Sequence, residues 1–215
     1  LDRVMTCDVD SDEPVVETVP KVPESPYGWS KLMVEQILAD TAAAHDFRYT
    51  ALRYFNVAGA DTKGRAGQST KGATHLIKVA CETAAGKRPS MEVFGTDYPT
   101  RDGTCVRDYI HVTDLVDAHY LALKRLRSGG ESLTANCGYG SGYTVLEVIE
   151  AVKRVSGKDF EVTMSPRRIG DAITVVANPG AALRELGWKP ACDDLDLIVR
   201  TALDWEKSLA LRNRF

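Results

Sequence analysis

Tyr27 and Lys31 stand four residues apart in a segment that shows helical periodicity. Residues at positions i and i+4 share one face of a helix. An ammonium group beside a phenol favours the phenolate form, and a phenolate can accept a proton from a substrate hydroxyl. The pair therefore predicts a proton acceptor, although the same spacing also arises wherever a tyrosine ring packs beside a solvated lysine.

The helix that would carry this pair is expected to begin at Ser25-Pro26, because proline is tolerated in the first helical turn. It should run from about Tyr27 to Ala44. A strand over residues 49–55 follows, because β-branched, aromatic and leucine residues alternate there. Residues 56–72 are rich in glycine and polar residues and are predicted to form a loop.

Helical and extended patterns continue to alternate along the rest of the chain. Further helices are expected over residues 74–86, 113–126, 144–156 and from about 193, and strands over 91–94, 133–136 and 160–164, with a turn-rich loop after 94. Thr144 and Glu147 have the spacing of a capping box, and Gly157 is placed to end that helix. The alternation indicates an α/β fold with mostly parallel strands.

The sequence contains no recognisable loop for a cofactor phosphate. Nucleotide-binding α/β units usually open with a strand, a glycine-rich loop and a helix. Gly138, Gly140 and Gly142 lack the G-x-G-x-x-G spacing, and no G-x-x-x-x-G-K-[ST] pattern occurs. We therefore expect an incomplete Rossmann-type sheet, and a chain that begins at Leu1 rather than Met is expected to be a fragment.

Composition excludes several classes of protein. The 215 residues include 27 basic and 30 acidic ones, which gives a net charge of −3 and no basic footprint for nucleic acid or for a membrane surface. His111 and His119 lack metal-ligand partners at suitable spacing, so we interpret them as structural and predict no metal site. Reduced thiols in a cytoplasmic protein are expected for the five scattered cysteines, which are Cys7, Cys81, Cys105, Cys137 and Cys192.

Five motifs occur in one order along the chain. They are Ser25-Pro-Tyr-Gly-Trp-Ser-Lys31, Arg53-Tyr-Phe-Asn56-Val-Ala-Gly59, the stretch from Phe94 to Asp114 with Arg107-Asp-Tyr-Ile-His111, Pro166-Arg-Arg168-Ile-Gly-Asp171, and Leu186-Gly-Trp-Lys-Pro190. Together they resemble the UDP-glucose 4-epimerase family of extended short-chain dehydrogenases, over residues from about 20 to 206. The resemblance implies an incomplete Rossmann-type doubly wound parallel sheet plus a smaller α/β substrate-binding domain.

The resemblance also implies a division of the chain and an activity. Residues 1–57 would be the C-terminal part of an NAD-binding Rossmann domain. Residues 58–215 would form mainly a UDP-sugar-binding domain, with some segments returning to the Rossmann sheet. Members of the family interconvert UDP-glucose and UDP-galactose by NAD-dependent oxidation and re-reduction at sugar C4, and they form homodimers through a helix pair.

Roles for individual residues follow from the same resemblance. Tyr27 would be the catalytic base and acid, with Lys31 as its partner. A third catalytic group would be Thr6, or Arg3 takes its position if the alignment has no gap. Residues near the cofactor NAD would be Tyr27, Lys31, Tyr54 and Phe55. Residues that bind the UDP-sugar would be Asn56, His75, Leu76, Phe94, Arg107, Arg168 and Asp171.

Residue chemistry agrees with these roles but does not require them. The planar guanidinium of arginine matches phosphate oxygens, and an aspartate can accept two hydrogen bonds from a vicinal diol. Arg107 could instead form a surface ion pair with Asp108. Arg168 and Asp171 could belong to an ordinary charged loop, and His75 could simply stand at the start of a helix.

Two other functions remain compatible with the sequence. A sugar-nucleotide 4,6-dehydratase or reductase of the same superfamily would need an acidic group near sugar C5 or C6, which the run from Asp8 to Asp12 could supply. A non-catalytic module would bind UDP without binding NAD. Because the glycine-rich loop is missing, we expect the isolated chain to be inactive even if the epimerase assignment holds.

Overall fold

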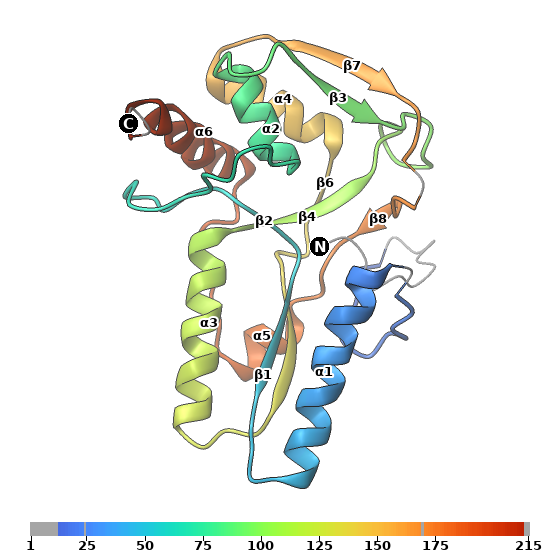
Figure 1. The fold of residues 1–215 in the computed structure, drawn as a ribbon, viewed down its shortest axis with the longest axis vertical. Coiled ribbons are helices and arrows are strands. Elements are labelled where there is room, and N and C mark those ends of the chain that lie inside the picture. The colour runs from blue at the N-terminus through green and yellow to red at the C-terminus, as the bar shows by residue number, and fades with distance from the viewer. Residues whose placement is uncertain (1–12, 24, 169, 213–215) are drawn as a thin grey trace.

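The computed structural model of the chain describes residues 13–23, 25–168 and 170–212. It has an elongated α/β structure, with a lower region around helices α1 and α3 and an upper region around helices α2, α4 and α6 (Figure 1). A set of short strands lies between the two regions. In the described part of the chain, no helix has the length and apolarity that a membrane span requires.

The lower region is built on a parallel pair of strands. Strand β1 (Thr50–Tyr54) pairs with β5 (Leu133–Cys137), with Thr50 opposite Leu133. Helices α1 (Pro26–Ala44), α3 (Val112–Arg127) and α5 (Gly180–Glu185) surround this pair (Figure 1). The core of this region gathers Ile110, Leu115 and Trp188, all of which are buried.

Strand β4 (Val106–His111) connects the two regions and is buried at every residue. It pairs in parallel with β2 (Asn56–Ala58) and β8 (Thr174–Val175), and antiparallel with β6 (Gly142–Thr144). The buried carboxylate of Asp108 accepts backbone hydrogen bonds from Tyr139, Gly140 and Ala177 at 3.0, 3.0 and 3.1 Å. This one side chain therefore holds two loops against the strand.

The upper region combines a second parallel pair with three packed helices. Strand β3 (Ser90–Phe94) pairs with β7 (Glu161–Ser165). The helices are α2 (Leu76–Ala84), α4 (Val145–Ser156) and α6 (Leu195–Arg212). Their buried side chains form a large apolar core that includes Ile77, Ile149 and Ile198.

The structure confirms the predicted class and corrects some elements. The α/β class with mostly parallel strands is confirmed, and so is the capping box: the Thr144 side chain accepts from Glu147 N, and the Glu147 side chain accepts from Thr144 N. The prediction of a loop throughout residues 56–72 is wrong for residues 56–58, which form strand β2. The loop predicted after residue 94 is followed by strand β4, which was not predicted. Strand β4 escaped detection because its buried positions include arginine, aspartate and histidine rather than an apolar run.

Candidate active site

The predicted proton acceptor lies in the first turns of α1. Pro26 begins the helix, and the Ser25 side chain caps it by accepting a hydrogen bond from Gly28 N at 3.1 Å. Lys31 Nζ lies 5.2 Å from the centre of the Tyr27 ring. Tyr27 is 42% exposed, so the residue is open to a ligand. The contact between Lys31 and Tyr27 that the spacing predicted is therefore present, as an ammonium group beside an aromatic ring.

An ion pair fastens α1 to the strand that leads to Tyr54. Glu35, one turn beyond Lys31, accepts hydrogen bonds from Arg53 Nε and Nη2, both at 2.7 Å, and from Lys21 at 2.9 Å. Burial opposes the charge on Glu35, but the hydrogen bonds from Arg53 and Lys21 outweigh it, so the pKa of Glu35 lies below its usual value. Sequence reasoning missed this residue as part of the site, although the i+4 spacing from Lys31 was visible.

The predicted residues at the end of β1 have different environments. The Tyr54 ring is partly exposed and lies 6.1 Å from the His119 ring, centre to centre. Phe55 is buried. Asn56 begins β2, where it stands opposite Tyr109 of β4. Of these consecutive residues, Tyr54 presents an accessible ring and Phe55 belongs to the packed interior.

Three of the predicted substrate residues contact one another in the upper region. Arg168 Cζ lies 4.6 Å from the centre of the Phe94 ring, and Arg168 Nε donates to Asp171 Oδ2 at 3.0 Å. Phe94 ends β3, while Arg168 and Asp171 lie in the segment after β7. An aromatic face, a guanidinium and a carboxylate therefore meet at the end of a strand pair. Such a set can stack on a base and bind phosphate or hydroxyl groups.

The neighbouring arginine, Arg167, makes different contacts. Arg167 Cζ lies 4.0 Å from the Tyr98 ring centre, and Arg167 Nε donates to Asp97 Oδ1 at 2.6 Å. Gly95, with φ of +80°, lies so close that a Cβ there would come within 2.4 Å of the Tyr98 ring. Burial raises the pKa of Tyr98 to about 12, so its phenol stays neutral. Arg167 thus secures the loop, and Arg168 remains on Phe94.

Arg107 is a buried cation on β4. Its Nη1 donates to the carbonyl oxygens of Val106 at 2.8 Å and Ile173 at 3.4 Å. The alternative of a surface ion pair with Asp108 is wrong, because both side chains are buried and Asp108 receives backbone N–H groups. Arg107 stands opposite Val175 of β8, in the segment that follows Asp171.

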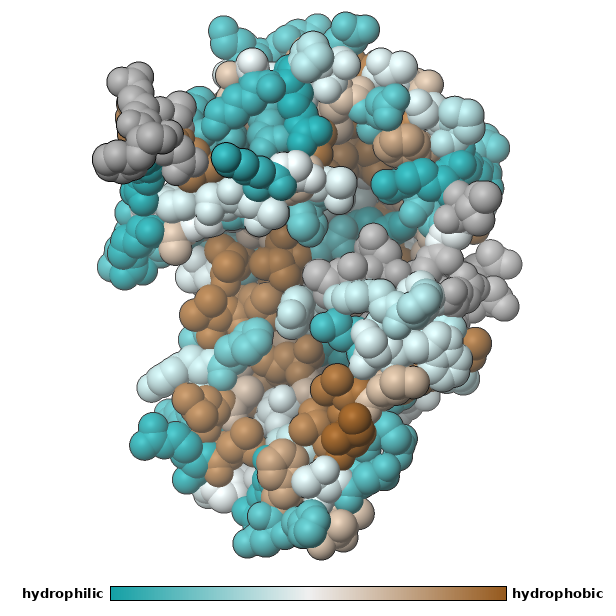
Figure 2. All heavy atoms as spheres, viewed as in Figure 1, coloured by the Kyte–Doolittle hydropathy of each residue, from teal (hydrophilic) through white to brown (hydrophobic). Residues whose placement is uncertain are grey.

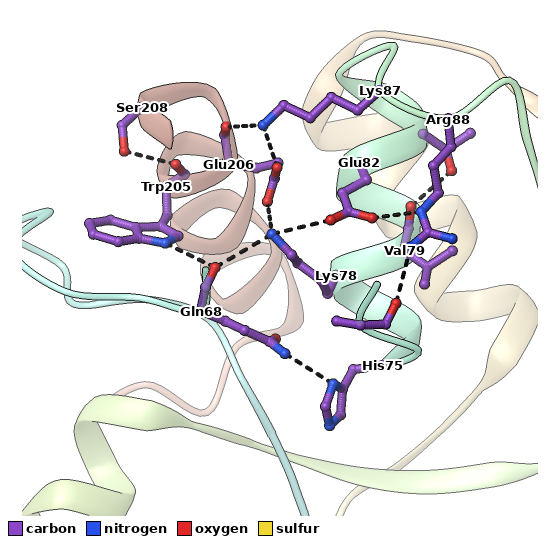
Figure 3. A network of polar contacts seen from close by, with 12 residues as sticks. Gln68, His75, Lys78, Val79, Glu82, Lys87, Arg88, Trp205, Glu206 and Ser208 are labelled. Atoms are coloured by element: carbon purple, nitrogen blue, oxygen red, sulfur yellow. Dashed lines mark hydrogen bonds and ion pairs between the residues drawn. The ribbon is translucent and has the colours of Figure 1, made fainter. Parts of the chain in front are cut away.

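His75 and Leu76 open helix α2. His75 occupies the position before the first helical residue, but its side chain makes no capping hydrogen bond. Its Nδ1 instead lies 3.0 Å from Gln68 Nε2 (Figure 3). Leu76 is partly buried and packs against the upper core. The remaining predicted catalytic residue, Thr6, and its alternative Arg3 lie outside the described residues.

Comparison with known proteins defines the class first. The model of the NAD dependent epimerase/dehydratase family matches residues 6–138, so the chain belongs to that family. Among curated proteins the chain is 57% identical over 196 residues to the UDP-glucose 4-epimerase of Azospirillum brasilense, covering 91% of this chain and 56% of that protein. It is 46% identical over 195 residues to the UDP-glucose 4-epimerase of Lacticaseibacillus casei, covering 91% of this chain and 59% of that protein.

Solved structures are similar over nearly the whole chain. A UDP-glucose 4-epimerase from Stenotrophomonas maltophila, crystallised with NAD and formylated UDP-arabinopyranose, superposes with a TM-score of 0.89 at 42% identity, covering 94% of this chain and 61% of that one. The Brucella ovis enzyme in complex with NAD gives a TM-score of 0.86 at 45% identity, covering 90% and 60%. The chain thus spans less than two thirds of the length of the relatives that it matches.

Proposed function

We propose that this chain is the substrate-binding and proton-transferring part of an enzyme that interconverts UDP-glucose and UDP-galactose through NAD-dependent oxidation and re-reduction at sugar C4. The observation that carries the proposal is the contact between Tyr27 and Lys31, with Lys31 Nζ 5.2 Å from the ring centre on an accessible helix face. The similarity to UDP-glucose 4-epimerases supports the assignment.

The residues present fit the nicotinamide end of NAD. Lys31 carries three N–H donors that suit ribose hydroxyls, and the accessible ring of Tyr54 offers an apolar surface at the end of β1. No glycine-rich phosphate loop occurs in the printed sequence, so these residues would hold only that end. When bound, NAD supplies the acceptor and donor of the hydride.

Proton transfer falls to Tyr27 in this proposal. The phenolate oxygen accepts the proton of the sugar O4 hydroxyl as C4 is oxidised, and it returns the proton when the 4-keto sugar is reduced on its opposite face. Lys31 lies beside Tyr27, with its Nζ 5.2 Å from the ring centre. Tyr27 therefore acts once as a base and once as an acid in each turnover.

The upper region would hold the UDP portion throughout the reaction. Arg168 and Arg107 would bind the diphosphate and ribose, Asp171 would accept the ribose hydroxyls, and Phe94 with Leu76 would flank the uracil. Asn56 and His75 complete the proposed substrate set. Binding energy far from C4 would keep the keto intermediate in place while the sugar turns.

The proposal extends to assembly as a homodimer and to a cytoplasmic location. Met33, Val34 and Ile37 expose apolar side chains on α1, and Figure 2 shows hydrophobic surface over α1, β1 and α3. A homodimer through a pair of helices would cover part of this surface. The described cysteines are buried free thiols, which suits the reducing cytoplasm.

Calorimetric titration of the chain with UDP, UDP-glucose and NAD⁺ tests the substrate half of the proposal. We expect UDP and UDP-glucose to bind with similar affinity, and Asp171→Asn or Arg168→Lys to weaken binding. The matched control is Arg167→Lys, because Arg167 pairs with Asp97 and stacks on Tyr98 rather than on Phe94. A chain that melts cooperatively yet gives no heat with UDP would overturn the assignment of the upper region.

The catalytic half is tested on the complete gene product. Tyr27→Phe should lower epimerase turnover by roughly 10²–10⁴-fold, the usual range for removing a general acid–base group. Tyr120→Phe, on an exposed face of α3, should leave turnover unchanged. Equal turnover in the wild type and in Tyr27→Phe would exclude the proposed proton acceptor.

A further inference from the structure

Lys78 places a positive charge in the interior between α2 and α6. Its side chain is only 7% exposed. The ammonium contacts three acceptors, which are a carboxylate oxygen of Glu206, Glu82 Oε1 at 3.3 Å and the carbonyl oxygen of Gln68 at 3.4 Å (Figure 3). An ammonium has three N–H donors, so each can be directed to one of these acceptors. The charge is therefore fixed in place, and one of its donors reaches a loop.

Glu206 ties this lysine to a second one. Its side chain is 3% exposed and pairs with both Lys78 and Lys87, and Lys87 Nζ also donates to the Glu206 carbonyl oxygen at 2.8 Å. Burial opposes ionisation of Glu206, but the hydrogen bonds from the two lysines outweigh it and lower its pKa. Lys78 and Lys87 thus share one carboxylate partner, yet the Gln68 contact belongs to Lys78 (Figure 3).

Helix α6 holds the loop that contains Gln68 at several points. Trp205 Nε1 donates to the Gln68 carbonyl oxygen at 3.1 Å, the same oxygen that Lys78 approaches. Gly67 lies against the Trp205 ring, where an added Cβ would come within 2.5 Å of it. Arg212 Nη2 donates to the Gly64 carbonyl oxygen at 2.7 Å. The backbone at Gln68 is consequently held between two donors from two helices.

The Gln68 side chain carries this constraint to the proposed substrate site. Its amide lies 3.0 Å from His75 Nδ1, directly before Leu76 at the start of α2 (Figure 3). We propose that Lys78 is a positioning residue for the uracil-side end of the site: it fixes the Gln68 carbonyl, and Gln68 in turn orients the His75 ring. This inference rests on the proposed function, because the roles of His75 and Leu76 in UDP binding belong to that proposal.

The test compares two lysine variants of the full chain. Lys78→Met and Lys87→Met each remove one partner of Glu206, but only Lys78→Met removes the donor to Gln68. We expect Lys78→Met to weaken UDP binding roughly tenfold in calorimetry. It should also shift the Trp205 indole N–H resonance and speed its exchange with solvent. Lys87→Met should leave the UDP affinity and the indole signal close to wild type.

A third variant separates the two links. Gln68→Ala keeps the backbone carbonyl with its donors but removes the amide beside His75, so UDP affinity should fall while the Trp205 indole signal stays unchanged. If Lys78→Met does not fold, the Lys78→Met/Glu206→Gln double variant removes both charges of the buried pair, and it is compared with Lys87→Met/Glu206→Gln, which keeps the donor to Gln68.

The outcomes keep this inference apart from the proposed function. If the two lysine variants weaken UDP binding equally, or if Lys78→Met leaves the Trp205 indole unchanged, Lys78 has only a structural role and the inference is wrong. If the wild-type chain does not bind UDP, the proposed function fails at the upper region. The indole comparison then still decides whether Lys78 fixes the loop.

Discussion

Helices α1 and α4 have the same kind of N-cap but differ in how they are attached to the rest of the protein. Ser25 and Thr144 each cap their helix through a side-chain hydroxyl. Helix α4 then buries four residues, which are Val148, Ile149, Ala151 and Val152, among the helices of the upper core. Within α1, whose residues are all described, only Gly28 is buried. Helix α1 is held by partly buried side chains such as Leu32 and Leu38 and by the ion pair between Glu35 and Arg53.

The part of the protein that is most tightly packed is therefore not the part that carries the proposed proton acceptor. The upper region is held together mainly by apolar contacts in its core, and this core supports the proposed substrate residues. The proposed proton acceptor stands on a helix with few buried residues and a charged ion pair, so small changes there can release the site without unfolding the core. Segments with few buried apolar contacts open locally at a lower free energy than the core does.

The largest effect should come from the same substitution made in the two helices. Ile149→Ala removes a fully buried side chain from α4 and should lower the free energy of unfolding by about 2–5 kcal/mol. Ile37→Ala removes an exposed side chain from α1 and should change it by less than about 0.5 kcal/mol. Urea unfolding followed by circular dichroism measures both. Equal losses would mean that α1 is packed as tightly as α4.

Removal of the Glu35 charge should release α1 locally. Glu35→Gln breaks a charged pair of low exposure, at 15% for Glu35 and 9% for Arg53. Hydrogen bonds to charged groups contribute about 1.5–3 kcal/mol, so amide exchange in α1 should speed up while exchange in α4 stays slow. The matched control is Asp40→Asn on the same helix, where the carboxylate contacts exposed Gln36. Exchange that accelerates equally in both helices would contradict a local role.

The two N-caps offer a smaller contrast. Thr144→Ala should lower the free energy of global unfolding by about 1 kcal/mol, because loss of a hydroxyl cap destabilises a helix that the core requires. Ser25→Ala should instead increase amide exchange in the first turn of α1, with little change in the melting temperature. A similar drop in melting temperature for both would show that α1 unfolds together with the core.

The smallest effect should appear on acidification. Burial lowers the pKa of His111, with partial compensation from Asp114 and Asp61. His111 in the unfolded chain therefore binds a proton near pH 6.5, whereas in the folded chain it binds one only at lower pH. The free energy of unfolding has its full value above about pH 6.5 and decreases as the pH falls below it. Glu35, with its lowered pKa, should keep its charge over this range, so α1 should stay attached.

Denaturant midpoints at pH 7.5 and pH 5.5 measure this loss, and amide exchange follows α1 in parallel. His111→Asn should flatten the pH dependence, because it removes the buried imidazole whose pKa is lowered. In the wild type this imidazole contacts Thr201 of α6 and accepts from Thr113 N at the start of α3. If α1 exchanges faster at pH 5.5 while the midpoint is unchanged, the assignment of the acid sensitivity to His111 is wrong.

Local patterns in the sequence were enough to predict the class and the helices α1, α2, α3, α4 and α6, but they missed the six-residue α5. The capping box at Thr144 and the Ser25-Pro26 start needed only their neighbours in the chain. Strands β6 and β8, of three and two residues, carry too little pattern to be detected. The burial of strand β4 could not be recognised from the sequence, because its polar residues Asp108 and His111 form hydrogen bonds with partners that are distant in the sequence.

Apart from the contact between Tyr27 and Lys31, the site could be predicted as residue types but not as contacts. Tyr27 and Lys31 meet because helix geometry fixes the i to i+4 distance. The stacking of Arg168 on Phe94 joins residues that only the pairing of β3 with β7 brings together. Arg107 lies in β4 between β6 and β8, and the link from Lys78 to His75 depends on how α6 packs against the Gln68 loop. No spacing in the sequence encodes either arrangement.

The parallel pairing of β1 with β5 has a consequence for synthesis. Tyr49 N, just before β1, bonds Ser132 Oγ, just before β5, across 83 positions of the chain. At about 5–20 residues per second, a ribosome delivers the partner strand roughly 4–17 seconds after β1. During that interval the edge of β1 that later pairs with β5 is open, so the nascent chain can form incorrect strand pairs there.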